Sequence, residues 1–155
     1  MKFVKLLLLS IVILLNFNGC EKKDLKELHQ VHWDRDMCAR CKMVVSERHH
    51  AVQVINVENG RSYMFDDIGC VVLWFDDEKI KWASSAKIWI TDVTTGKWID
   101  ARKAFYNTNN ITPMAYGLAA HKSKESIKEG EEIVNFEEMS KRIFKIEESK
   151  NRKAY

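Results

Sequence analysis

The hydrophobic positions in the first half of the chain predict a β-hairpin. Residues 51–57 are rich in valine and isoleucine, and such β-branched residues favour strands. The Asn59-Gly60 pair that follows is typical of a tight hairpin turn. We therefore expect residues 62–65 to form the returning strand.

A strongly apolar segment after this hairpin predicts a buried helix over residues 67–77. Asp66 is a suitable N-cap, because an aspartate side chain can accept a hydrogen bond from a free backbone N–H of the first helical turn. Apolar residues recur at helical spacing and also occupy the other faces, which indicates a helix packed between layers. Residues 87–93 and 97–100 have the pattern of two further strands.

The second half of the chain repeats this order with a weaker pattern. Strands are expected at 104–107, 116–121 and 132–136, and a short helix at 123–129 is expected between the last two, with Ser123 as its N-cap. An amphipathic helix over 137–148 would close the chain, with four apolar residues directed inward: Met139, Ile143, Phe144 and Ile146. The predicted fold class is therefore α+β, with two small repeated ββαβ units and a C-terminal helix.

The start of the chain has the features of a bacterial lipoprotein signal. Lys2 and Lys5 form a basic segment, and residues 6–15 form an apolar run that is too short to span a bilayer comfortably. A small residue then precedes Cys20, which we expect to be lipidated. An ordinary secretory signal with a chance cysteine is the alternative.

These patterns divide the chain of 155 residues into four parts. A signal peptide is expected over 1–19, a tether over 20–35, a first ββαβ unit over 36–100, and a second unit with the final helix over 101–155. Removing the signal takes away two lysines, which lowers the formal net charge from +3 to about +1. This near-neutral balance gives no support for nucleic-acid binding.

The stretch from 36 to 43 concentrates sulfur: Met37, Cys38, Cys41 and Met43 lie within eight residues. Soft thiolate and thioether ligands select soft metals, Cu(I) first among them, whereas zinc sites do not use methionine. We place this stretch in a loop or short turn, where the two cysteines can converge. The sequence therefore favours a Cu(I) site that uses these side chains.

Several motifs resemble those of the NosL family, the lipoproteins accessory to nitrous oxide reductase. Beside the lipoprotein-type start, they are found in the segments 41–43, 64–70, 89–92, 98–101 and 112–117. The resemblance implies a monomeric protein, anchored at the periplasmic face of a bacterial membrane, that binds one Cu(I) and delivers it for assembly of the reductase's copper-sulfide centre during denitrification. It also implies a fold of two ββαβ halves.

The resemblance assigns metal ligands as well. Cys41 and Met43 match the family's Cys-x-Met motif, and Met114 matches its downstream methionine. Cys41 would supply the negative charge, while Met43 and Met114 would bind without a proton step. Cys38 is a second thiol that many family members lack, and we include it among the predicted ligands. A nitrogen ligand would come from one of four histidines: His32, His49, His50 and His121. The predicted site includes His50.

Two other functions compete with copper transport. Cys38 and Cys41 have the Cys-x-x-Cys spacing of thiol-disulfide proteins, so they could exchange disulfides or act as a redox gate on a copper site. A structural zinc site could use Cys38, Cys41, Cys70 and one histidine, although a free cysteine such as Cys70 is commonly just a buried small residue. No hydrolytic or nucleotide-binding motif is present, so we do not expect an enzyme.

Overall fold

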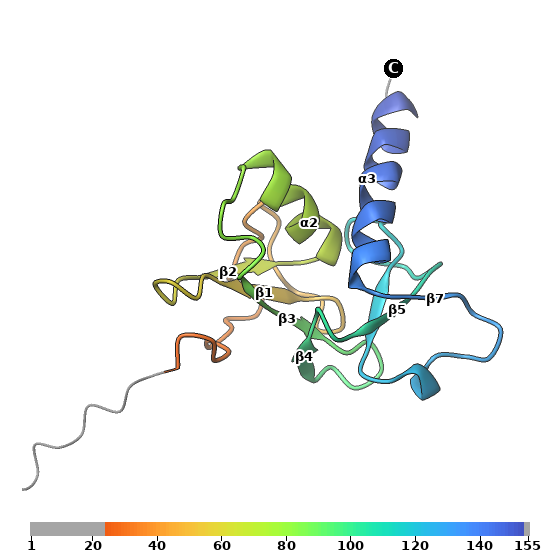
Figure 1. Ribbon diagram of the computed structural model, residues 1–155, viewed down its shortest axis with the longest axis horizontal. Coiled ribbons are helices and arrows are strands. Elements are labelled where there is room, and N and C mark those ends of the chain that lie inside the picture. The colour runs from red at the N-terminus through yellow and green to blue at the C-terminus, as the bar shows by residue number, and fades with distance from the viewer. Residues whose placement is uncertain (1–23, 154–155) are drawn as a thin grey trace, which may run out of the picture.

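The computed structural model describes residues 24–153, which form two small antiparallel sheets and two α-helices around a shared core (Figure 1). The predicted α+β class is confirmed. The predicted signal peptide and Cys20 lie outside the described residues. Within the described range, none of the helices combines the length and the apolar character needed to cross a membrane.

The first sheet has four strands in the order β2-β1-β3-β4. They are β1 (Val52–Ile55), β2 (Ser62–Phe65), β3 (Lys87–Thr91) and β4 (Trp98–Asp100). All neighbours are antiparallel, and the hairpin of β1 and β2 turns through Gly60, whose φ of 72° suits glycine. The predicted strands are confirmed, with ends one or two residues shorter in several of them.

Helix α2 (Ile68–Asp77) follows β2 directly and is buried from Ile68 to Trp74, as its all-round apolar pattern predicted. Its N-cap is Asp67, whose side chain accepts a hydrogen bond from the Gly69 N–H at 2.8 Å. The prediction of Asp66 as the cap was wrong by one residue. Both aspartates suit a cap chemically, and the backbone turn decides which of them faces the helix terminus.

The second sheet has three strands in the order β6-β5-β7. They are β5 (Phe105–Asn107), β6 (Ala119–His121) and β7 (Ile133–Val134). Between β6 and β7, only the 3₁₀ helix η2 (Lys124–Ser126) forms where a longer helix was predicted, and Ser123 makes no side-chain cap hydrogen bond. A segment this short and polar buries no residue, so packing does not extend the helix.

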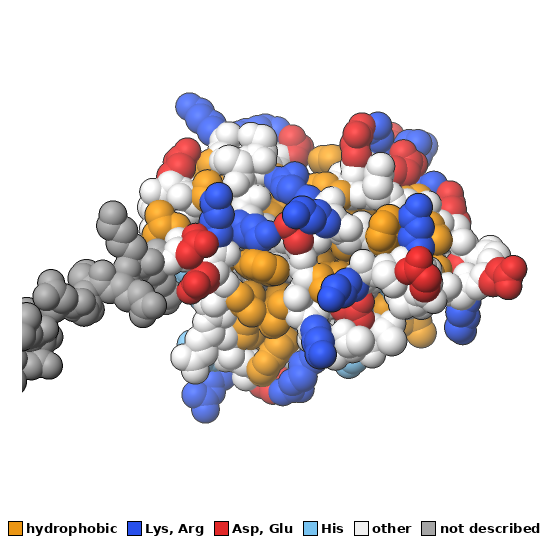
Figure 2. Space-filling model, turned by 60° about the horizontal axis from the view of Figure 1, so that its bottom comes forward, with side chains coloured by type: hydrophobic (Ala, Val, Ile, Leu, Met, Phe, Trp, Pro, Cys, Tyr) orange, Lys and Arg blue, Asp and Glu red, His pale blue; other side chains and the backbone are white. Residues whose placement is uncertain are grey.

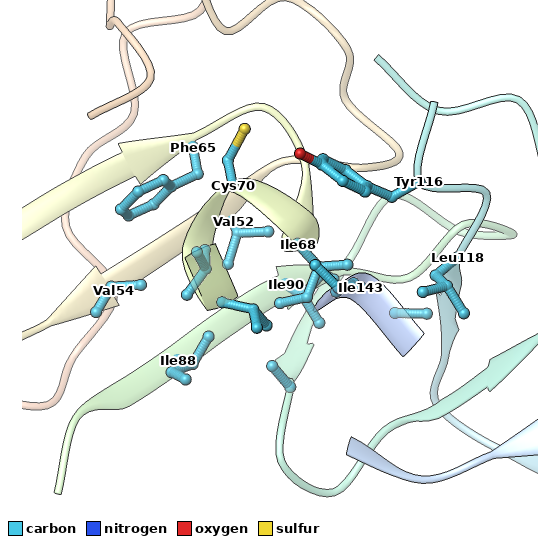
Figure 3. Packing of buried hydrophobic residues seen from close by; sticks show 14 of the residues in the cluster. Val52, Val54, Phe65, Ile68, Cys70, Ile88, Ile90, Tyr116, Leu118 and Ile143 are labelled. Atoms are coloured by element: carbon cyan, nitrogen blue, oxygen red, sulfur yellow. The ribbon is translucent and has the colours of Figure 1, made fainter. Parts of the chain in front are cut away.

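Helix α3 (Phe136–Lys153) is longer than predicted and lies beside α2, with its end pointing away from the strands (Figure 1). Met139 and Ile143 are fully buried in the shared core, as expected. Figure 3 shows Ile143 among the residues of this core. Phe144 is 44% exposed, so the expectation that it points inward was wrong. One residue after Ile143 on a helix, its side chain is rotated about 100° away from the core.

Two features join the parts of this fold. Residues 24–35 run along the first sheet, where the His29 N–H donates to the Gln53 side chain and the Trp89 indole donates to the Lys26 carbonyl. At the end of β3, the buried Asp92 carboxylate accepts a hydrogen bond from the N–H of Lys122, just beyond β6, at 2.8 Å.

Acidic and basic side chains are interspersed on the face seen in Figure 2.

Candidate metal centre

The sulfur-rich segment forms a tight loop, as predicted, and this loop lies at the edge of the first sheet. Met37 and Val44 pair as antiparallel neighbours, and the Cys38 N–H donates to the Met43 carbonyl at 2.8 Å. Lys42 takes a positive φ of 64°, which tightens the turn. The Ala39 N–H also donates to the carbonyl of Met64 in β2 at 2.8 Å, so the loop is fixed to the sheet.

This attachment brings the loop next to the first turn of α2. Asp66 lies just before that helix and Cys70 lies in its first turn, four residues later. One ligand atom from each of Cys38, Cys41, Asp66 and Cys70 lies within 4.8 Å of the other three. Three thiols and one carboxylate from two segments of the first half of the chain, the 38–41 loop and the start of α2, therefore converge at one point.

The cluster is closed on one side and open on the other. Cys38 and Cys70 are fully buried and Asp66 is 2% exposed, whereas Cys41 is partly exposed. All three cysteines are free thiols. A metal ion or an exchanging ligand would therefore reach the cluster at Cys41.

The three thiols have divergent acidities because they lie so close together. Hydrogen bonding with Cys70 lowers the pKa of Cys38 from 9.0 to about 6, in spite of its burial. Burial and the neighbouring Cys38 raise the pKa of Cys41 to about 12, and the hydrogen bond to Cys38 together with burial raises the pKa of Cys70. The cluster thus holds one thiolate readily, and a cation would be needed to stabilise more negative charge.

Asp66 has weak hydrogen-bond partners for a carboxylate this deeply buried. The Cys41 thiol lies 3.5 and 3.4 Å from its two oxygens. Cys38 also contacts the Asp66 side chain, so the donors around this carboxylate are thiols. A thiol is a weak donor, so the carboxylate stays available to a stronger partner.

The two predicted methionine ligands border this cluster. Met43 is 49% exposed, and its carbonyl accepts the hydrogen bond from Cys38. Met114 is partly buried, and its N–H donates to Asp67, the neighbour of Asp66, at 3.2 Å. Met43 is thus joined to Cys38 and Met114 to the aspartate next to Asp66, and the role of both as ligands stays a prediction.

Among the described residues, which include all five histidines, the cluster contains none of them. His50 is partly buried, and burial lowers its pKa. His49 contacts the Val93 carbonyl, His32 pairs with Asp36, and both ring nitrogens of the buried His121 have partners in Asn107 and Ser126. The prediction that His50 completes the site stays a prediction.

Asp66 and Cys70 are not among the copper ligands that the sequence predicts. Cys70 was placed in the alternative zinc site, and Asp66 was interpreted as a helix cap. Their spacing was the available signal, because residues four apart at a helix start lie on the same side. The sequence could not show that the loop from Cys38 to Cys41 meets that side.

The donor chemistry of the cluster fits a soft or borderline metal ion. Thiolates bind Cu(I) and Zn²⁺ strongly, and a carboxylate can be a fourth ligand for zinc. Ca²⁺ and Mg²⁺ require mainly oxygen ligands, which this cluster does not supply.

Comparisons with known proteins identify the fold but not a family by sequence. The chain matched none of the family models and none of the curated proteins searched. Its fold belongs to a class of α+β proteins in which two small antiparallel sheets and their helices share one core. The crystal structure of the copper chaperone NosL from Shewanella denitrificans has this fold: the TM-score is 0.61 at 13% sequence identity, over 73% of this chain and 95% of that chain. The resemblance to NosL is thus confirmed at the level of the fold.

Proposed function

We propose that this protein is a Cu(I) carrier that binds the ion at the cluster of Cys38, Cys41 and Cys70. The observation that carries the proposal is the convergence of three free thiols, two of them fully buried and one reachable from outside. Thiolates are the protein ligands that Cu(I) prefers. The bound ion would supply the positive charge that lets neighbouring thiols lose their protons together.

The surroundings of the cluster suit transfer rather than storage. Met37 and Met43 are 54% and 49% exposed on the loop that carries Cys38 and Cys41. Thioethers bind Cu(I) without a proton step, and exposed ones can exchange with ligands of an acceptor. Cys41 would therefore be the thiolate at which a partner first shares the ion.

The resemblance described above supports a proposal for the acceptor and the location. We propose that the acceptor is nitrous oxide reductase, whose copper-sulfide centre requires copper during assembly. We also propose that lipidated Cys20 holds the monomeric protein at the periplasmic face of a bacterial membrane. The fold of a copper chaperone supports a carrier rather than an enzyme.

Structural zinc is a second candidate because Asp66 lies inside the thiol cluster. With Cys38, Cys41 and Cys70 it makes a set of four ligands of types that zinc uses. In this case the ion would be permanent, and it would fix the loop to α2. The exposed methionines would then have no part in binding.

An anaerobic Cu(I) titration against a competing chelator tests the proposal, with Zn²⁺ titrated in parallel. The protein used is a soluble form that begins at residue 20 and carries Cys20→Ser. We expect one tightly bound Cu(I), lost in Cys41→Ser and weakened in Met43→Leu and Met114→Leu. Preferred Zn²⁺ binding that ignores both methionine variants would favour the zinc site. If neither metal binds and Cys38 and Cys41 oxidise readily to a disulfide, thiol-disulfide exchange would replace both metal functions.

A further inference from the structure

Arg40 lies between the two cysteines of the metal loop and ties that loop to three other elements. Its guanidinium donates from Nε to Asp77 at the end of α2 at 2.8 Å. It donates from Nη1 to the Tyr116 hydroxyl at 3.3 Å and from Nη2 to Glu147 of α3 at 3.0 Å. The position of the loop therefore depends on α2, on the segment around Tyr116 and on α3.

Tyr116 extends this connection to the first turn of α2. Its hydroxyl donates to the second carboxylate oxygen of Glu147 at 2.8 Å. Its ring lies so close to Gly69 that a Cβ added there would overlap a ring carbon. Gly69 precedes Cys70, and Figure 3 shows the Tyr116 side chain pointing towards the turn that carries this thiol. Tyr116 is thus wedged between α3 and the metal cluster.

Lys150, one turn beyond Glu147 on α3, contacts the segment that carries Met114 and Tyr116. Its ammonium group lies 3.8 Å from the centre of the Tyr116 ring and donates to the Met114 carbonyl at 2.6 Å. Because residues three apart share one side of a helix, Glu147 and Lys150 act from the same face of α3. One helix face thus contacts both the cysteine loop and the Met114 segment.

The ion pair at the centre of this arrangement is sheltered from solvent. The side chains of Arg40 and Glu147 are 21% and 23% exposed. By contrast, the Lys141–Glu137 pair on the same helix has side chains that are 60% and 77% exposed. A sheltered pair with several charge-assisted hydrogen bonds restrains its neighbours more than an exposed pair does.

We propose that Arg40, Tyr116, Glu147 and Lys150 are positioning residues, which we call the α3 clamp, and that they set the rate at which metal leaves the thiol cluster. The inference rests on the proposed carrier function. With the clamp closed, the cysteine loop and the Met114 segment are held against α2. When the C-terminal half of α3 moves away, Arg40 loses Glu147, the loop loosens at Cys41, and the metal becomes easier to remove.

Glu147→Gln tests the clamp, because it removes the charge that faces Arg40 and keeps the size of the side chain. Glu137→Gln is the matched control on the same helix. All proteins in this test carry Cys20→Ser, so that their cysteines are the three of the cluster. One readout is the rate at which Ellman's reagent labels the metal-free thiols; the other is the rate of Cu(I) transfer to bathocuproine disulfonate.

We expect both rates to rise about tenfold in Glu147→Gln, the effect of losing roughly one charge-assisted hydrogen bond. The circular dichroism spectrum should match that of Glu137→Gln and the melting temperature should be at most a few degrees lower, whereas a general loss of structure would change both strongly. Arg40→Gln should raise both rates similarly, and the double variant Arg40→Gln/Glu147→Gln should add little, because the two residues act as a pair.

Two results would overturn the inference. If Glu147→Gln and Glu137→Gln are alike in both rates, the clamp does not restrain the loop. If thiol labelling accelerates but Cu(I) transfer does not, the clamp positions the loop without governing metal release. Should the unsubstituted protein bind no Cu(I), the carrier function fails by itself, and the labelling rates still decide whether α3 restrains the loop.

Discussion

Two aspartates of this protein are almost equally buried, yet the fold treats their carboxylates in opposite ways. Asp92 is 3% exposed and accepts hydrogen bonds from the N–H groups of Thr94, Thr95 and Lys122 and from the Thr95 hydroxyl, at 2.8–3.0 Å. Asp66 is 2% exposed and faces the Cys41 thiol at 3.4–3.5 Å. One carboxylate is saturated by the protein, and the other is not.

The difference separates a structural role from a binding role. A buried carboxylate costs free energy unless strong donors compensate it. At Asp92 the turn after β3 and the end of β6 supply those donors, so the carboxylate joins the two sheets. At Asp66 the surrounding thiols are weak donors, so they compensate little of the free-energy cost of burying the carboxylate. A bound cation would compensate the rest.

Adding Cu(I) should stabilise the thiol cluster and leave the Asp92 turn unaffected. A free Cu(I) concentration 1,000-fold above the dissociation constant would raise the free energy of unfolding by about 4 kcal/mol. Anaerobic thermal unfolding with and without buffered Cu(I) measures this gain. Cys41→Ser should show almost none of it, and an equal gain in Cys41→Ser would place the binding site elsewhere.

Asp92→Ala should produce the largest loss of stability among the substitutions considered. The change leaves three backbone N–H groups and one hydroxyl without their acceptor, which we expect to cost roughly 3 kcal/mol in urea unfolding. Thr95→Val, which removes the hydroxyl alone, should cost about 1 kcal/mol. Cu(I) affinity should not change in either variant; a weakened affinity in Asp92→Ala would mean that the two regions are coupled.

Asp66→Asn should show the reverse behaviour. The free energy of unfolding of the metal-free protein should change by less than about 1 kcal/mol, because the carboxylate has few strong partners to lose. Metal affinity should fall, since the charge facing the thiols is removed. Parallel urea unfolding and chelator competition measure both. A large loss of stability without a change in affinity would show that Asp66 is structural, like Asp92.

The pH dependence of stability offers the smallest but most specific contrast. Burial alone would raise the pKa of Asp92, but the hydrogen bonds from Lys122, Thr95 and Thr94 lower it overall. Its contribution to stability is therefore present above the unfolded-state pKa of about 3.9 and is lost as the pH falls through the lower folded-state value.

Unfolding free energies measured from about pH 5 down to about pH 2 test this linkage. The unsubstituted protein should lose more stability over this range than Asp92→Ala, because the variant has no carboxylate at 92 to protonate. If the unfolding free energy has the same slope against pH in both proteins, the hydrogen bonds to Asp92 do not stabilise its ionised form.

The sequence was most informative where the signals are local. The Asn59-Gly60 turn, the apolar run of α2 and the two cysteines of the sulfur-rich loop depend on residues close together in the chain, and the structure has each of them as predicted. The second half was harder. The predicted helix at 123–129 shrank to η2, because its pattern lacks an apolar face that packing could hold in place.

The metal centre was predictable only in part because its geometry depends on a long-range contact. Cys38 and Cys41 were identified from their spacing. Asp66 and Cys70 join them only because the loop hydrogen-bonds to Met64 in β2, at the end of which α2 begins. No periodicity within either segment encodes that contact. The choice of Asp67 over Asp66 as the cap is set by the local backbone turn, and it leaves Asp66 free to face the thiols.

X-ray absorption spectroscopy at the copper edge of the Cu(I)-loaded protein tests whether the three thiols bind the ion. We expect a first shell of sulfur with distances typical of Cu(I) thiolates, which loses one sulfur in Cys70→Ala and keeps its composition in Asp92→Ala. A shell that contains an imidazole nitrogen and stays unchanged in Cys70→Ala would show that copper binds away from the thiol cluster, and the proposed site would be wrong.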